Sequence, residues 1–544
     1  MSTISSDTRD LSDDSVIPPR EEPRDDRMPS GIPFIVANEF AERFCYYGIN
    51  AILSIYMTQF LRFGEAEATS FHSLFKSGAY FFPLVGAIVS DVFWGKFKTI
   101  MIFSISYMSG CAMVALVPGK FGLIFGLFLV AFGTGGIKPC VSTNVGDQFT
   151  SKNQHLIERA FSYFYLAINA GSSISIYFCP VLLQKFGPKL AFGMPAVAMF
   201  LATIFFWSGR KRYAVVPPAG RAWLKDVLSA DGIKTIGSLA IIYFFVAFFW
   251  ALWDQSNGQT WTLQAQSSLM DKNLGFGFTV LPAQIQVVNG LFILAMVPIF
   301  TFFVYPVMGK FFKVTPLRKI GIGLFVTGGS FLIVAWIESR IQSGHSVSAW
   351  WQIVAYLVMT AGEVLVSITA LEFSYKQAPL RMKSFIMSLF LLSTSIGNLI
   401  TAGVNSAMVK PVQASAIETG AETWVKVDNA ASFVSGQKID FAGDTGIKVT
   451  KPNGKSETLD GTYLVSQVDG AGGRLRLMDV IERAPIATIG AFDAEHAKVS
   501  TYRLVGPQYF EFFTILVTGM GVIFIFVAAR YRERTHLRDE SARA

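Results

Sequence analysis

Long apolar stretches dominate this sequence and leave few folds open to it. A transmembrane helix needs about 20 consecutive, predominantly apolar residues. The chain of 544 residues is 52% hydrophobic and only 15% charged, whereas soluble domains average about 25% charged. The pattern therefore predicts an all-α membrane protein with twelve transmembrane helices. The predicted segments are 32–61, 70–95, 99–118, 121–145, 160–184, 189–208, 236–256, 280–308, 318–338, 349–372, 384–409 and 508–530.

The distribution of lysine and arginine predicts the orientation of these segments. Basic residues gather in alternate short loops and in the C-terminal tail, and loops rich in basic residues stay in the cytoplasm. Both termini are therefore expected in the cytoplasm, with no cleavable signal peptide. The longest basic connector follows segment six and divides the helices into two groups of six. The expected parts are a disordered tail at 1–30, a first bundle at 31–208, a linker at 209–235, helices seven to eleven at 236–409, an insert at 410–507, helix twelve at 508–530 and a tail at 531–544.

The insert differs in character from the rest of the chain. It is polar and rich in glycine, with short alternating stretches such as TWVKV, KIDFAG and TYLVSQV. Such stretches, separated by turn residues, are typical of β-strands, and Asn453–Gly454 is a hairpin-turn signal. We expect a small β-rich domain outside the cytoplasm, in the periplasm if the cell has two membranes.

Several classes of function receive no support. The net charge of +8 comes with basic residues in short loops between apolar segments, so no nucleic-acid surface is expected. The four cysteines fall in membrane segments and form no metal-ligand or disulfide pattern. No nucleophile–base pair stands out, so we expect no enzyme, metal site or cofactor. The sequence identifies no protein partner.

The first segment carries charges that an anchoring helix would not tolerate. Glu39, Glu42, Arg43 and Tyr46 are spaced i, i+3, i+4 and i+7 and share one helical face. Each charge costs a few kcal/mol at mid-membrane. The polar stripe must therefore face protein or water, either as a structural salt bridge or as a functional site.

This stretch, NEFAERFCYYG at 38–48, resembles the E-x-x-E-R-F-x-Y-Y motif of the proton-coupled oligopeptide transporters. That family belongs to the major facilitator superfamily, whose fold is two six-helix bundles with a site at midplane. The run GTGGIKPCVSTNVGDQF at 133–149 resembles the second family signature. Its glycines permit close helix approach. Its buried Lys138 should need an acidic partner, and we expect that partner to be Glu39 or Glu42.

The resemblance implies roles for further residues in this numbering. Proton coupling is expected at Glu39, Glu42, Lys138 and Asp254, and Glu363 is expected to receive the amino terminus of a peptide. The expected peptide-binding residues are Arg43, Lys138, Glu363, Tyr46, Tyr47, Tyr80, Asn169, Trp250, Asn289 and Ser393.

The chain departs from the family pattern beside Asp254. Relatives commonly carry an arginine seven residues after the first-helix arginine, and it pairs with this acid; here that position is Asn50. We therefore expect Asp254 to lack this basic partner and the outer gate to be held differently. His72 is either a proton carrier or, more simply, a histidine near the outer membrane surface.

These features predict a proton-coupled symporter that imports di- and tripeptides across the inner cell membrane. One alternative is a transporter of the same fold for another small solute, such as nitrate, an amino-acid conjugate or a drug. Glu363 argues against a simple anion because it would repel one. A second alternative is a surface-binding protein that acts through the insert, but an anchor would need no intramembrane charges.

Overall fold

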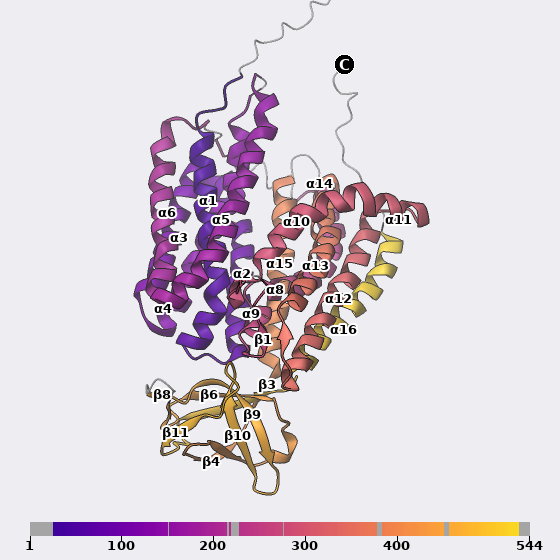
Figure 1. Ribbon diagram of the computed structural model, residues 1–544. Helices are drawn as coiled ribbons and strands as arrows, with labels where there is room; N and C mark the ends of the chain where they lie inside the picture. The colour runs from indigo at the N-terminus through magenta and orange to yellow at the C-terminus, as the bar shows by residue number, and fades with distance from the viewer. Residues whose placement is uncertain are drawn as a thin grey trace, which may run out of the picture.

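A computed structural model describes residues 26–150, 152–214, 217–218, 228–275, 277–377, 383–450 and 456–531. Within these residues the chain forms two groups of long helices and a small β-rich region at one end of them (Figure 1). We call the end of the helical part against which this region lies the insert face. The Asn453–Gly454 turn and nearly all of the two predicted tails lie outside the described residues.

Each of the twelve predicted segments coincides with a helix, which confirms the all-α membrane fold. Eleven helical spans in the described ranges are long and apolar enough to cross a membrane, and α1 is a twelfth long helix that carries the charged stripe. The N-terminal half holds α1 (Ile32–Ile55), α2 (Glu65–Ile88), α3 (Lys96–Leu116), α4 (Gly119–Asp147), α5 (Ile157–Phe186) and α6 (Pro188–Ser208). The C-terminal half holds α8 (Ala230–Ser256), α9 (Thr260–Ala265), α10 (Val287–Ile299), α11 (Tyr305–Phe311), α12 (Pro316–Gln342), α13 (Trp350–Glu363), α14 (Thr369–Gln377), α15 (Lys383–Met408) and α16 (Pro507–Arg530).

Local sequence explains several of the helix ends. Pro188, Pro316 and Pro507 begin α6, α12 and α16, because proline lacks the N–H that the first helical turn leaves unpaired. Short π-helical segments interrupt the α-helical pattern at four points of the described chain, and such segments are frequent at functional sites. These segments are η1 (Tyr56–Phe60), η2 (Val89–Trp94), η6 (Phe300–Val304) and η7 (Val364–Ile368).

The glycines of α4 bring its backbone close to neighbouring helices, as the sequence predicts. A Cβ atom at Gly135 would lie 2.1 Å from Cβ of Phe82, and one at Gly136 would lie 2.0 Å from the ring of Phe103. A side chain at either position would push α4 away from α2 or α3. These contacts support the helix that carries Lys138.

The region after α15 is β-rich, as predicted. A seven-stranded sheet has the order β3-β12-β6-β9-β10-β5-β4, and a three-stranded sheet has the order β11-β7-β8. Strands alternate buried and exposed residues around a small apolar core that includes Val425, Phe441 and Leu475. The strands are β3 (Val409–Pro411), β4 (Ala414–Glu418), β5 (Trp424–Val427), β6 (Lys438–Gly443), β7 (Ile447–Thr450), β8 (Ser456–Thr458), β9 (Gly461–Asp469), β10 (Arg474–Asp479), β11 (Ala487–Gly490) and β12 (Ala497–Tyr502); a separate pair joins β1 (Met270–Asp271) to β2 (Val347–Ser348).

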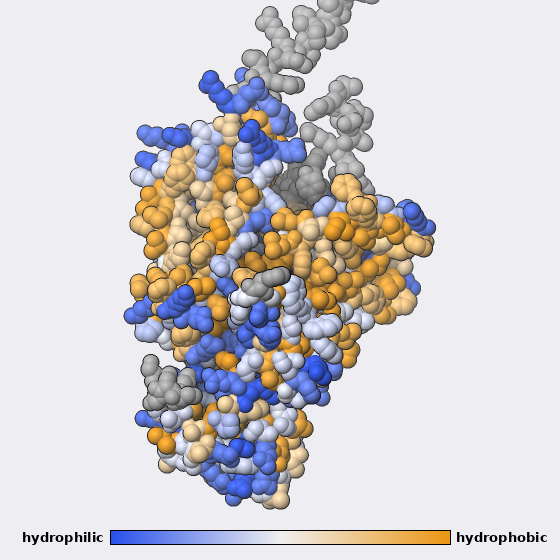
Figure 2. Space-filling view, in the orientation of Figure 1, coloured by the Kyte–Doolittle hydropathy of each residue, from blue (hydrophilic) through white to orange (hydrophobic). Residues whose placement is uncertain are grey.

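The two parts of the molecule have different surfaces. Hydrophobic side chains cover much of the helical part in the view of Figure 2, whereas hydrophilic side chains prevail over the β-rich region. Large exposed apolar residues occur on the outer faces of the helices, for example Phe125, Leu201 and Phe302. Apolar surface of this extent is compatible with lipid and not with water.

Candidate functional site

Three charged side chains of α1 form one ion-paired group. Arg43 Nε lies 2.9 Å from Glu39 Oε1, and Arg43 Nη2 lies 2.5 Å from Glu42 Oε2. All three side chains are buried, and Thr134 of α4 donates a hydrogen bond of 2.8 Å to Glu42 Oε1. A guanidinium can hold two carboxylates because its donors form a planar fork. Two carboxylates thus share one guanidinium in this group.

The ammonium of Lys138 does not pair with either carboxylate of α1, so that prediction is wrong. Within the described ranges no carboxylate lies within 4 Å of its Nζ; the Nζ lies 3.7 Å from the ring centroid of Tyr80 and 5.5 Å from that of Tyr46. A cation over an aromatic face is attracted by the ring quadrupole. Arg43 occupies both carboxylates instead. The Nζ of Lys138 is therefore left without a carboxylate partner among the described residues and is available to a ligand.

An open cavity adjoins this group. Its lining includes Glu39, Arg43 and Lys138 from the N-terminal half and Ser388 and Leu391 from α15 of the C-terminal half. Asp91 within η2 and Lys96 at the start of α3 line it farther from the insert face. The cavity thus lies between the two halves and extends away from the insert face.

Glu363 supplies an acidic group from the C-terminal half. Its Oε2 accepts hydrogen bonds from Trp253 Nε1 at 2.8 Å and from Asn289 Nδ2 at 2.9 Å. Asn289 also donates to Thr360 at 3.0 Å, which orients its amide. Trp253 and Asn289 both donate to Oε2, so neither of them bonds Oε1.

Trp253 is a site residue that the sequence reasoning missed. It lies three residues after Trp250, and residues spaced i, i+3 share a helical face; this spacing was the available signal. The two indoles pack edge to face with centroids 5.2 Å apart, and Trp250 also contacts the Phe390 ring at 6.4 Å. The indole N–H of Trp253 thereby points at Glu363.

The remaining predicted peptide contacts divide into two groups. Tyr46 packs against Tyr47 at 5.5 Å and Tyr80 at 6.5 Å between ring centroids, so these rings form one aromatic wall. Asn169 instead donates to the backbone oxygen of Tyr165 in its own helix. Ser393 is fully buried and donates to the backbone oxygen of Phe390. In this conformation each of these two side chains donates a hydrogen bond within its own helix.

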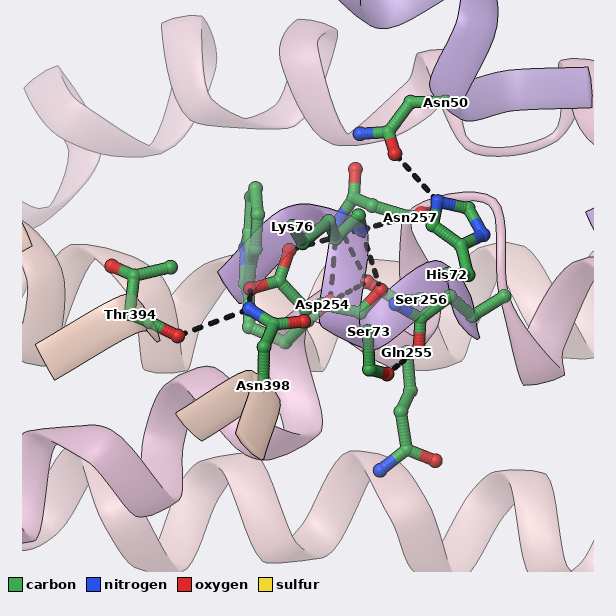
Figure 3. Close-up of polar contacts among 12 residues, drawn as sticks. Asn50, His72, Ser73, Lys76, Asp254, Gln255, Ser256, Asn257, Thr394 and Asn398 are labelled. Atoms are coloured by element: carbon green, nitrogen blue, oxygen red, sulfur yellow. Dashed lines mark hydrogen bonds and ion pairs between the residues drawn. The ribbon is translucent and has the colours of Figure 1, made fainter. Parts of the chain in front are cut away.

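A second buried charge pair lies nearer the insert face and corrects the prediction for Asp254. Lys76 Nζ lies 3.0 Å from Asp254 Oδ1 and also donates to the backbone oxygens of Asp254 and Asn257, at 3.0 and 2.8 Å (Figure 3). Asn398 of α15 donates to Asp254 Oδ2 at 2.6 Å. Asp254 therefore does have a basic partner, contributed by α2 in place of the arginine. We call these four residues the Lys76 cluster.

His72 lies beside the Lys76 cluster and is fully buried among the helices. Its Nε2 is 2.6 Å from Asn50 Oδ1 (Figure 3), and its Nδ1 is 2.8 Å from Ser54 Oγ. A neutral imidazole has one donor and one acceptor nitrogen, which matches an amide oxygen and a hydroxyl. Asn50 therefore bonds His72 and leaves Asp254 to Lys76.

The two halves are in contact on the side of the Lys76 cluster. Ser77 of α2 is 2.8 Å from Ser395 of α15, and Ser70 is 3.3 Å from Ser406, oxygen to oxygen. Gly258 has φ +81°, and a Cβ there would lie 2.2 Å from the backbone oxygen of Asn50. Only glycine permits this approach between the turn after α8 and α1. The halves are thus closed toward the insert face.

Two helical bundles that enclose a polar, charged cavity define the major facilitator fold, and comparisons with known proteins agree. The PTR2 model of the POT family matches residues 97–230 and 221–425. The chain belongs to the POT family.

Curated relatives and solved structures place the chain in the same family. The chain is 37% identical over 381 residues to "Peptide transporter family 1" of Drosophila melanogaster, covering 61% of this chain and 50% of that protein. It is 37% identical over 365 residues to "Solute carrier family 15 member 2" of Homo sapiens, covering 58% and 49%. The chain spans about half the length of the curated relatives it matches. These names are those of transporters and not of enzymes.

The similar solved structures include one that extends over the insert. The "auto inhibited POT family peptide transporter" has a TM-score of 0.69 and 27% identity and covers 94% of this chain and 99% of its own. The structure of "POT family transporter PepTSo" has a TM-score of 0.63 and 34% identity and covers 70% of this chain and 90% of its own. The auto inhibited transporter therefore matches a larger share of this chain than PepTSo does.

Proposed function

We propose that this protein is a proton-coupled symporter that imports di- and tripeptides by alternating access. The observation that carries the proposal is the separation of charge between the halves: Arg43 and Lys138 belong to the N-terminal half and Glu363 to the C-terminal half. A peptide is a zwitterion whose ends lie one or two Cα steps of about 3.8 Å apart, plus the terminal groups. Opposite charges on opposite halves bind both ends and draw the halves together.

The ion-paired group of α1 supplies the coupling to protons. Glu39 and Glu42 compete for Arg43, so a proton on either carboxylate weakens its hold on the guanidinium. Arg43 and the unpaired Lys138 are then available to the carboxylate of the peptide. One proton that crosses 100 mV contributes about 2.3 kcal/mol, which corresponds to roughly fiftyfold accumulation. The Lys76 cluster, which includes Asp254, acts in this scheme as the gate on the insert face.

The same proposal assigns an orientation and domain boundaries. The basic loops place both termini in the cytoplasm and the insert at 410–507 in the periplasm, or outside the cell if there is one membrane. The bundle at 31–208 and helices seven to eleven at 236–409 with helix twelve at 508–530 are the moving halves, joined by the linker at 209–235. The cavity beside Arg43 then opens toward the cytoplasm.

The test uses purified protein in liposomes with an inward proton gradient and radiolabelled dialanine. We expect accumulation that a protonophore abolishes and that unlabelled trialanine competes away, while N-acetyl-dialanine competes poorly because it lacks the ammonium that Glu363 binds. Liposomes without protein are the control. Equal competition by both compounds would contradict the role of Glu363, and absent uptake by intact protein would favour another solute.

Trp253→Phe should weaken recognition of the peptide amino terminus. The change keeps an aromatic ring but removes the indole N–H bonded to Glu363, and a hydrogen bond to a charged group contributes about 1.5–3 kcal/mol. We expect the KM for dialanine to rise about tenfold with kcat little changed, and the discrimination against N-acetyl-dialanine to fall. Trp336→Phe, on an exposed face, is the matched control. If the KM for dialanine and the discrimination against N-acetyl-dialanine are both unchanged, Trp253 does not orient Glu363.

A further inference from the structure

The insert is joined firmly to the C-terminal half. Strand β3 directly follows α15, and its partner β12 leads within five residues to α16. A Cβ at Gly506 or Gly436 would lie 2.2 or 2.7 Å from Gln342 at the end of α12, which shows how closely the insert packs there. The backbone N–H of Ser268, after α9, donates to the oxygen of Ile481 at 2.8 Å. The insert should therefore move as one body with the C-terminal half.

The insert also contacts the N-terminal half, at the short connection between α1 and α2. Lys438 Nζ of β6 lies 2.6 Å from Glu65 Oε2. The backbone N–H of Glu65 donates to Thr462 Oγ1 at 3.0 Å, and Arg62 forms an ion pair with Glu457. None of these bonds is covalent. They join the moving halves without passing through the Lys76 cluster.

A buried polar group completes this contact. Tyr502 OH accepts a hydrogen bond from the backbone N–H of Ala66 at 3.2 Å and donates one of 2.6 Å to Asp440. Asp440 also accepts a bond of 2.7 Å from Thr462, and burial raises its pKa to about 7. A Cβ at Gly64 would lie 2.1 Å from the Asp440 carboxylate. The connection between the helices thus fits the insert at the level of its backbone.

We propose that the insert is a latch that holds the start of α2 against the C-terminal half and so stabilises the conformation closed on the insert face. Helix α2 links the latch to the gate, because it carries Glu65 at its first turn and Lys76 three turns further on. When the halves separate on this face, the connection between α1 and α2 must leave the insert. The latch therefore sets how often the face opens. This inference rests on the proposed function only in that the two halves move.

The test measures opening directly and needs no transport. Ser70→Cys introduces a thiol between α2 and α15, where Ser70 is 8% exposed, and a membrane-impermeant maleimide applied from the insert face reports opening. Lys438→Glu places a carboxylate against Glu65. We expect labelling at least fivefold faster than in Ser70→Cys alone, and a return toward the parent rate in the charge-swapped pair Glu65→Lys/Lys438→Glu. The protein without Ser70→Cys gives the background from its four buried native cysteines.

Two further variants keep the test decisive. Lys498→Glu makes the same charge change at an exposed position of the insert and should leave labelling unchanged. Tyr502→Phe removes the hydroxyl between Ala66 and Asp440, keeps the ring, and should speed labelling two- to threefold even if Lys438→Glu fails to fold. If Lys438→Glu folds and is labelled at the parent rate, the latch is overturned. If Lys438→Glu does not fold, parent-rate labelling of Tyr502→Phe overturns it. Because the latch is read from labelling alone, faster labelling in the latch variants supports it whether or not peptide is taken up, whereas absent uptake by the folded parent protein contradicts only the proposed function.

Discussion

Glu42→Gln is expected to abolish accumulation of dialanine against its gradient while leaving exchange of labelled for unlabelled peptide intact. Glu42 is fully buried and shares Arg43 with Glu39. A glutamine cannot take up a proton, so its hold on Arg43 no longer changes during the cycle. Exchange needs the halves to rock only with peptide bound, and no net proton movement is required.

Proteoliposomes with an inward proton gradient measure both quantities. The accumulation ratio should fall from as much as roughly fiftyfold per proton at 100 mV to about one, and exchange should keep at least half of its parental rate. Glu158→Gln, the same chemical change at an exposed position in the first turn of α5, should leave both unchanged. Undiminished accumulation in Glu42→Gln would remove Glu42 from the coupling mechanism.

Lys76→Met is expected to destabilise the protein strongly, and Asp254→Asn in the same chain should restore most of the loss. Lys76 is fully buried and holds Asp254 at 3.0 Å. Breaking a buried pair by removing one partner costs about 3–5 kcal/mol, because a buried charge is left uncompensated, whereas neutralising both partners is often tolerated. Asn398 remains as a hydrogen-bond partner for the substituted residue 254.

Thermal unfolding in detergent tests this second expectation. The single variant should show a clearly lowered midpoint, and the double variant a midpoint close to that of the parent. Lys120→Met, at an exposed lysine whose nearest carboxylate is 3.9 Å away, controls for loss of a lysine on the surface. If the double variant is no more stable than Lys76→Met, the Lys76–Asp254 pair is not the source of the loss.

The pattern of apolar residues was sufficient to predict the helices. Boundaries differ from the predicted segments by only a few residues, and strands β5, β6 and β9 of the insert fall on the alternating stretches TWVKV, KIDFAG and TYLVSQV. Both signals are local, because burial in lipid or on one face of a sheet imposes its period on adjacent residues. The charged face of α1 followed from the same local periodicity.

Partner choice was not predictable in this way. Lys138 was expected to pair with Glu39 or Glu42, but Arg43 on the same helix reaches both. Asp254 was expected to lack the arginine partner that relatives carry, and Lys76, 178 residues away in sequence, takes its place. Trp253 was overlooked because only packing shows which indole faces Glu363.

The sequence by itself determined the membrane-spanning helices, the charged stripe on α1, the β-rich insert and the resemblance to one transporter family. Only the tertiary structure showed which buried charges pair and which do not. It also showed that Asn50 bonds His72 and that the insert contacts the connection between α1 and α2. The physical reason is the distance along the sequence over which each effect acts. Periodicity and motif spacing act within a few helical turns, whereas a buried charge is neutralised by whichever opposite charge the packed helices bring within a few ångströms.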